Sequence, residues 1–164
     1  MKSIHLVGGI IAVALLAAGC SKQSATSQQP DFVAHLTGGE QVPAVTTDAT
    51  GTASFWLNPD HTELRYELSV TNLNDVTMAH LHLGAAGENG PPVVWLYPSS
   101  PPPKEIPGAT NGVLSQGSIK ADNLVGPLAG KSVNDLVDAI KANKIYVNVH
   151  TTAHPEGEIR GQVQ

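Results

Sequence analysis

Two histidines that stand two residues apart are the residues in this chain best suited to bind a metal ion. They occur in the segment AHLHLG, where His80 and His82 alternate with small and aliphatic residues. Side chains alternate between the two faces of a strand, so both imidazoles project from one face, about 6.6 Å apart along it. Imidazole is a common ligand of zinc and copper. An H-x-H pair alone is more often solvated than bound to metal, so the interpretation needs further ligands nearby.

A third candidate ligand lies in the segment KIYVNVHTTAHPEGEIRGQV, residues 144–163. The alternate residues from Ile145 to Val149 are aliphatic and define a core face, which sends His150 to the opposite face. In the following strand Arg160 also projects away from the core. If these strands are neighbours, three imidazoles and one guanidinium meet on one outer patch, which predicts a metal site there.

The fourth ligand is left open between His154, which follows His150 in a loop, His35 on the first strand, and water. His61 is expected in a solvated turn. Glu158 shares a face with Arg160, and two interpretations stay open for it: an ion pair that orients the arginine, or a surface salt bridge of little energetic weight.

Short runs rich in Val, Ile, Leu and Thr, separated by Gly and Pro, favour an all-β antiparallel sandwich or barrel. The alternation is clearest from Leu64 to Val70, where one face is apolar and the other polar. The expected strands are residues 31–37, 51–57, 62–70, 77–83, 93–97, 113–120, 144–150 and 158–163.

One short helix interrupts this pattern. Ser132 is the expected N-cap, Asp135 the acidic partner three residues later, and Val133, Leu136, Val137 and Ile140 the apolar stripe. The proline-rich residues 98–112 are expected to form a surface loop.

The beginning of the chain predicts export. Lys2 precedes an apolar run too short to cross a bilayer, so residues 1–19 are interpreted as a signal peptide. The ending LAAGC resembles the lipobox of bacterial lipoproteins, which implies that Cys20 becomes the lipidated first residue. Residues 20–30 would then be a polar tether and residues 31–164 one domain, held by lipid to a bacterial membrane in the periplasm or at the cell surface.

The composition of the chain argues against one class of partner and against internal disulfides. The formal net charge is −5 and the domain has no cluster of lysine or arginine, which argues against nucleic acid as a partner. Cys20 is the one cysteine of the chain, so the domain can form no internal disulfide. The sequence leaves the oligomeric state open.

Three segments together resemble the CHRD domain, which was first named from chordin and is common in bacterial exported proteins. They are LTGGEQVPAV at 36–45, AHLHLGAAGENGPPVVWL at 79–96 and YVNVHTTAHPEGEIRGQV at 146–163. The resemblance covers residues 32–163.

The layout also resembles copper-zinc superoxide dismutase, which implies a Greek-key barrel. By this resemblance His80, His82 and His150 match copper ligands, and Arg160 matches the arginine that guides the anionic substrate. The loop at 84–92 has no histidine and the enzyme's disulfide is missing. A copper site without a second zinc site is therefore expected, with His154 as the replacement ligand.

Three functions follow from these patterns, in order of preference. The first is a copper-dependent superoxide dismutase, which converts superoxide to oxygen and peroxide. The second is a module that binds copper or zinc without turnover. The third is a non-catalytic interaction domain in which the histidines are incidental. This hypothesis is kept because fold analogy alone does not establish function.

Overall fold

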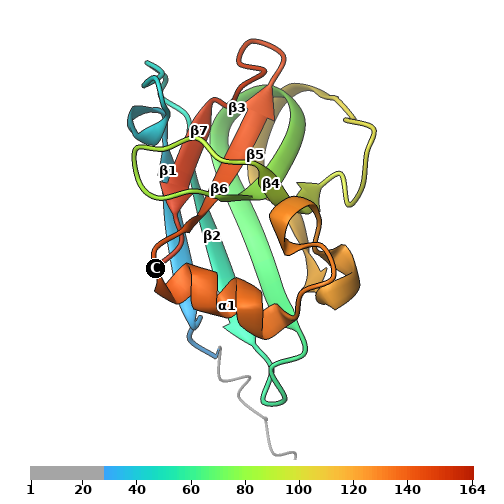
Figure 1. Cartoon of the computed structure of the whole chain (residues 1–164). Helices are drawn as coiled ribbons and strands as arrows, with labels where there is room; N and C mark the ends of the chain where they lie inside the picture. Colours follow the sequence, from blue (N-terminus) through green and yellow to red (C-terminus); the bar gives the residue numbers. More distant parts are fainter. Residues whose placement is uncertain (1–27) are drawn as a thin grey trace, which may run out of the picture.

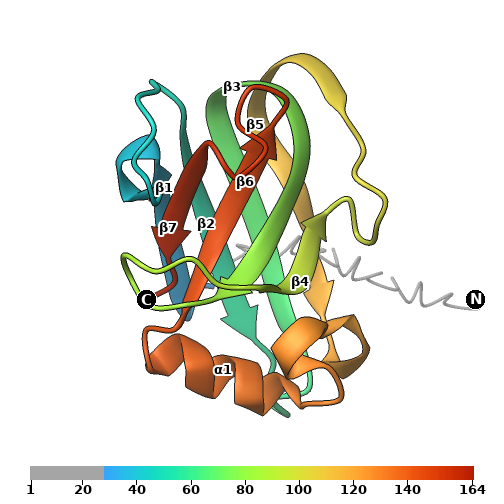
Figure 2. The ribbon, with the colours of Figure 1, turned by 45° about the horizontal axis from the view of Figure 1, so that its top comes forward.

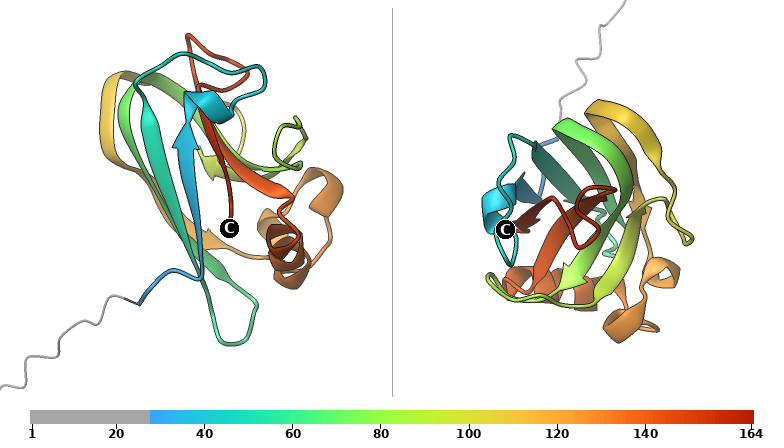
Figure 3. Two further views of the ribbon diagram at one scale, coloured as in Figure 1. Left: turned by 90° about the vertical axis from the view of Figure 1, so that its left-hand side faces the viewer. Right: turned by 90° about the horizontal axis from the view of Figure 1, so that it is seen from above.

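One long strand organises residues 28–164, the part of the chain that the computed structural model describes. β3 (Leu64–Leu83) pairs with β2 (Thr50–Leu57) along its first half and with β6 (Ile145–Thr151) along its second half. β1 (Phe32–Thr37) and β7 (Ile159–Gln162) lie between those two strands, in the order β2-β1-β7-β6. Both ends of this path bond to β3, so the antiparallel sheet closes into a barrel, as the view from above shows (Figure 3). The predicted all-β barrel with one short helix is confirmed.

Two further strands occupy the other edge of β3. β5 (Ile106–Ile119) pairs with its first half and β4 (Pro92–Tyr97) with its second half. Three single-turn 3-10 helices lie in connections: η1 (Gly38–Glu40), η2 (Ala121–Asn123) and η3 (Gly126–Leu128). The result is a strand, β3, whose backbone is paired on both edges along most of its length.

The helix α1 (Val133–Lys141) lies beside the end of the barrel where β6 begins (Figure 1). The side chain of Ser132 accepts a hydrogen bond from the Asp135 backbone N–H, and the Asp135 carboxylate accepts one from the Ser132 N–H. The predicted capping box is therefore confirmed, and the predicted apolar stripe is buried. In the described part of the chain, no helix has both the length and the apolar character that a membrane span needs.

The barrel interior contains the aliphatic face of each central strand. Ala79 and Leu81 of β3, Val147 and Val149 of β6, and Ile159 of β7 are fully buried there. The histidines therefore leave the opposite face of the same strands, as the alternation predicts.

The structure corrects two strand predictions. The expected strands 62–70 and 77–83 are parts of the one strand β3, which begins at Leu64 and ends at Leu83. Asn72 and Asp75 have positive φ angles of 59° and 51°, and register shifts beside them let the strand bend without ending. Asn72 and Asp75, which are typical turn residues, therefore form a bend within the strand rather than a turn between two strands. β5 also begins at Ile106, inside the region expected to be a loop.

Candidate metal centre

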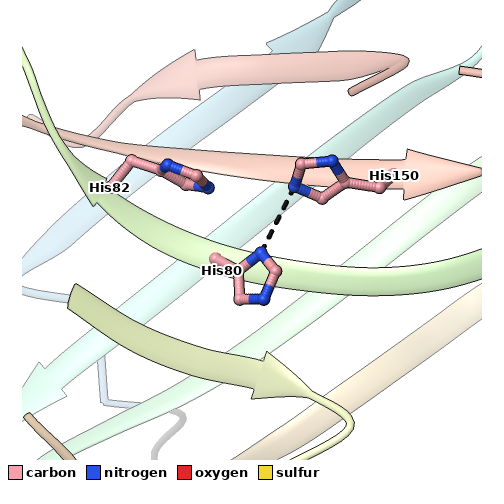
Figure 4. Close-up of side chains that lie close together, drawn as sticks. All are labelled: His80, His82 and His150. Atoms are coloured by element: carbon pink, nitrogen blue, oxygen red, sulfur yellow. Dashed lines mark hydrogen bonds between the residues drawn. The ribbon is translucent and has the colours of Figure 1, made fainter. Parts of the chain in front are cut away.

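Three of the predicted ligands converge. Within residues 28–164, His80, His82 and His150 form a group whose potential ligand atoms all lie within 4.8 Å of one another. β6 pairs with the second half of β3, which brings His150 beside the two β3 histidines. Nδ1 of His80 lies 3.3 Å from Nε2 of His150, and the ring of His82 faces both from centroid distances of 5.4 Å and 5.9 Å (Figure 4).

Backbone carbonyl groups set the tautomers of two of these rings. Nδ1 of His82 lies 2.8 Å from the carbonyl oxygen of Gly90, and Nδ1 of His150 lies 2.8 Å from that of Pro155. A carbonyl oxygen only accepts, so each Nδ1 carries the proton and donates. Nε2 of both rings then keeps its lone pair, and an Nδ1–H bonded to a carbonyl is the usual second contact of a metal-binding histidine.

The donor set fits a metal ion. Nε2 of His82 is buried and has no hydrogen-bond partner, which is rare for a buried polar atom and calls for an explanation such as an ion. At bond lengths of about 2.0–2.1 Å, two nitrogens 3.3 Å apart subtend roughly 110° at the ion. His80 and His150 can therefore bind one ion with little movement.

The three histidines lie on the outer face of the barrel strands, but this face is covered rather than exposed to solvent. His80, His82 and His150 are 4%, 8% and 6% exposed. Two segments lie over this face: the cover loop (residues 84–91) and the β6–β7 loop (residues 152–158). The cover loop extends from β3 across β6 toward β7 (Figure 2). Strand alternation identifies the face that leaves the core, but it cannot predict that loops from elsewhere in the chain will cover it.

Arg160 projects from the face of β7 opposite the core, and it is only 2% exposed because the cover loop lies over it. One Nη atom donates to the Glu88 carbonyl and to Oδ1 of Asn89, each at 3.1 Å, and the other donates to the Ala85 carbonyl at 3.5 Å. The guanidinium thus holds the cover loop against the sheet. Burial lowers the pKa of Arg160, while Tyr146 and Glu40 act in the opposite direction.

Two aromatic rings that the sequence analysis did not assign to the site form its walls. Tyr146 is stacked on His82 with ring centroids 5.0 Å apart, and its hydroxyl accepts a hydrogen bond from the Gly90 N–H. The indole of Trp95 meets the ring of His80 edge to face at 4.2 Å. Tyr146 shares a strand face with His150, so the alternation of β6 was the signal that could have identified it. Trp95 is brought opposite His80 by the pairing of β4 with β3.

Burial keeps the three imidazoles neutral. It lowers the pKa of His80 to about 3, with a smaller contribution from the charges of His150 and His82. It also lowers the pKa of His82 to about 4, against the opposing effect of the bond to Gly90. The pKa of His150 is lowered by burial as well, and the Pro155 carbonyl opposes that shift. The site is therefore ready to bind a cation at neutral pH, since only unprotonated imidazole is a ligand.

The other candidate residues lie outside the group of three. His154 is half-buried in a surface hollow between residues 41–45, which follow η1, and the β6–β7 loop, and His35 is exposed on β1. Glu158 is buried and accepts hydrogen bonds from the hydroxyls of Thr47 and Thr151 at 2.8 Å and 2.7 Å. Neither interpretation of Glu158 is correct, because it is neither paired with Arg160 nor at the surface. Cys20 lies outside the described residues.

The pKa shifts predict how the stability of the metal-free protein depends on pH. The unfolded chain takes up protons on histidine below about pH 6.5, whereas folded His80 and His82 stay neutral until about pH 4. Stability is therefore full above pH 6.5 and is lost as the pH falls toward 4. Urea unfolding at pH 7 and pH 5 should reveal this decrease. His82→Gln should make this loss of unfolding free energy smaller, whereas His61→Gln, at an exposed position, should leave the loss unchanged. A free energy of unfolding that is equal at both pH values would contradict the prediction.

Comparison with known proteins identifies the family. The model of the CHRD domain matches residues 32–163. Chordin from Xenopus laevis is 31% identical over 137 residues, which are 78% of this chain and 12% of chordin, so the chain spans only a small part of that relative. No solved structure matches. With the family model matching almost all of the described residues, the chain belongs to the CHRD domain family.

Proposed function

We propose that this CHRD domain binds one copper ion through His80, His82 and His150. The observation that carries the proposal is the convergence of these three imidazoles, two of which are fixed by carbonyl groups so that their lone pairs face the group. Copper is favoured because the ligands are nitrogens and because copper has the highest affinity of the divalent first-row metals for such sites. The buried, unpartnered Nε2 of His82 supports the proposal independently.

The proposal predicts tight binding of one copper ion per chain that depends on these histidines. His80→Ala combined with His82→Ala removes two of three ligands and should weaken binding by at least about 100-fold. Competition with a coloured chelator gives the affinity, and elemental analysis gives the stoichiometry. His35→Ala combined with His61→Ala is the matched control, since it removes two exposed imidazoles. Equal binding by both double variants would exclude this site, and no binding by the unmodified protein would favour an interaction module instead.

Superoxide dismutation is the second candidate function, and it rests on the number of ligands. Three protein nitrogens leave a coordination position for a small anion, which a catalytic metal site requires. The chemistry that bound copper supplies is one-electron exchange, by which two superoxide ions and two protons become dioxygen and hydrogen peroxide. The carbonyls of Gly90 and Pro155 would keep two imidazoles oriented throughout, and Arg160 would add positive potential for an anion.

If the site turns over, copper-loaded protein should remove superoxide much faster than the double variant His80→Ala/His82→Ala treated in the same way. The reason is that without these ligands copper is not held beside the open position. Stopped-flow decay of superoxide absorbance measures the rate. If the unmodified protein binds copper but removes superoxide no faster than the double variant, the protein is not a superoxide dismutase. Copper binding without turnover would then be the remaining function of the site.

We also propose that the protein is exported and anchored to a bacterial membrane through lipid on Cys20. The support is the sequence alone: an apolar run followed by LAAGC and then a polar segment. One lipid-modified residue would attach the domain to the membrane while residues 31–164 remain in the aqueous phase.

Anchoring through Cys20 predicts that Cys20→Ala moves the protein from the membrane fraction of a bacterial host to the soluble fraction, because the thiol that accepts the lipid is removed. Fractionation followed by mass spectrometry of the N-terminal peptide measures both location and modification. Ser24→Ala, in the same polar segment, should change neither. An unmodified Cys20 in the mature protein would contradict the proposal.

A further inference from the structure

A buried positive charge lies beside a ligand group that contains no carboxylate. The group consists of three histidines, each neutral when it acts as a ligand. Arg160 is 2% exposed, and among residues 28–164 no carboxylate oxygen lies within 4.0 Å of its guanidinium nitrogens. Its hydrogen bonds go to two carbonyl groups and one amide, which carry no charge. The charge of Arg160 is therefore not cancelled by a direct partner.

Tyr146 links this charge to the metal site. The guanidinium carbon of Arg160 lies 3.7 Å from the centre of the Tyr146 ring, and the ring of His82 is stacked on Tyr146 at 5.0 Å. The two distances place the guanidinium carbon at most about 9 Å from the centre of the His82 ring. Glu40 is the carboxylate whose charge raises the pKa of Arg160. Glu40 is exposed, so water screens its charge. The space between cation and site is filled by protein, where charges interact more strongly than in water.

We propose that the uncancelled charge of Arg160 makes the three-histidine site favour the cuprous over the cupric ion. This inference rests on the proposed copper site. Each copper ion bound by neutral imidazoles keeps its full charge, so the repulsion from Arg160 is larger for the doubly charged ion. The guanidinium carbon lies within about 9 Å of the His82 ring centre. At an effective dielectric constant of about 20, one extra unit charge at a distance on that order changes an equilibrium constant on the order of tenfold. Zinc, which is always doubly charged, is disfavoured to the same degree.

The test cancels the charge without removing the arginine. Oδ1 of Asn89 accepts a hydrogen bond from Arg160 at 3.1 Å, and Nδ2 of Asn89 donates one to the Val42 carbonyl at 2.7 Å. Asn89→Asp keeps the acceptor for Arg160 and adds a carboxylate, but it loses the bond to Val42. Asn89 is exposed on the cover loop, so the substitution leaves the core intact. Ala86→Asp is the matched control, because it adds the same charge to an exposed position of the same loop without a contact to Arg160.

The quantity to measure is the ratio of the affinities for Cu(I) and Cu(II), each from competition with a chelator specific for that ion. Asn89→Asp should lower this ratio about tenfold by strengthening Cu(II) binding, and Ala86→Asp should change it less than about threefold. Arg160→Gln should lower the ratio as well. A ratio that stays equal in Asn89→Asp and the unmodified protein would overturn the inference, as would equal shifts in Asn89→Asp and Ala86→Asp. Failure of the unmodified protein to bind either ion would overturn the proposed copper site itself, so the two failures are distinguishable.

Discussion

Two hydrogen bonds from histidine to backbone carbonyl groups are the constraint on which the candidate site depends. They join His82 to Gly90 and His150 to Pro155, and they decide which nitrogen of each ring keeps a lone pair. Both carbonyls belong to loops rather than strands. The cover loop and the β6–β7 loop must therefore be correctly placed before the imidazoles can act as a set, and several other contacts serve this purpose.

The loops are held by polar side chains on the same outer face of the sheet. Arg160 and Gln162 donate to carbonyl groups of the cover loop, and Asn148 donates to the Glu156 carbonyl of the β6–β7 loop. The approach of the cover loop also requires glycine at position 90, because a Cβ there would lie 1.7 Å from the Leu83 carbonyl oxygen. On β6, β7 and the second half of β3, the polar face of the barrel is thus a second, hydrogen-bonded interior rather than a wetted surface.

Sequence patterns predict the parts of this arrangement that depend on local periodicity. The alternation at His80, His82 and His150 predicted their common face, and the spacing of Ser132 and Asp135 predicted the helix start. Burial of the site could not be predicted in this way, because it depends on loops that contact strands far away in sequence. Arg160 is an example. A polar residue opposite a core face is normally expected to be exposed, but Arg160 is buried by partners in the cover loop that lie 71 to 75 residues away in the sequence. The bend of β3 was missed for a related reason, since Asn72 and Asp75 signal a turn and the pairing strands determine whether the strand continues.

The central proposal is that three imidazoles beneath two loops hold one copper ion. The most direct test is a crystal structure of the copper-loaded protein with anomalous scattering measured at the copper absorption edge. We expect one strong peak between His80, His82 and His150, with the Nδ1 atoms of His82 and His150 still bonded to the carbonyls of Gly90 and Pro155. A copper peak at His35, His61 or His154 with none between the three histidines would contradict it.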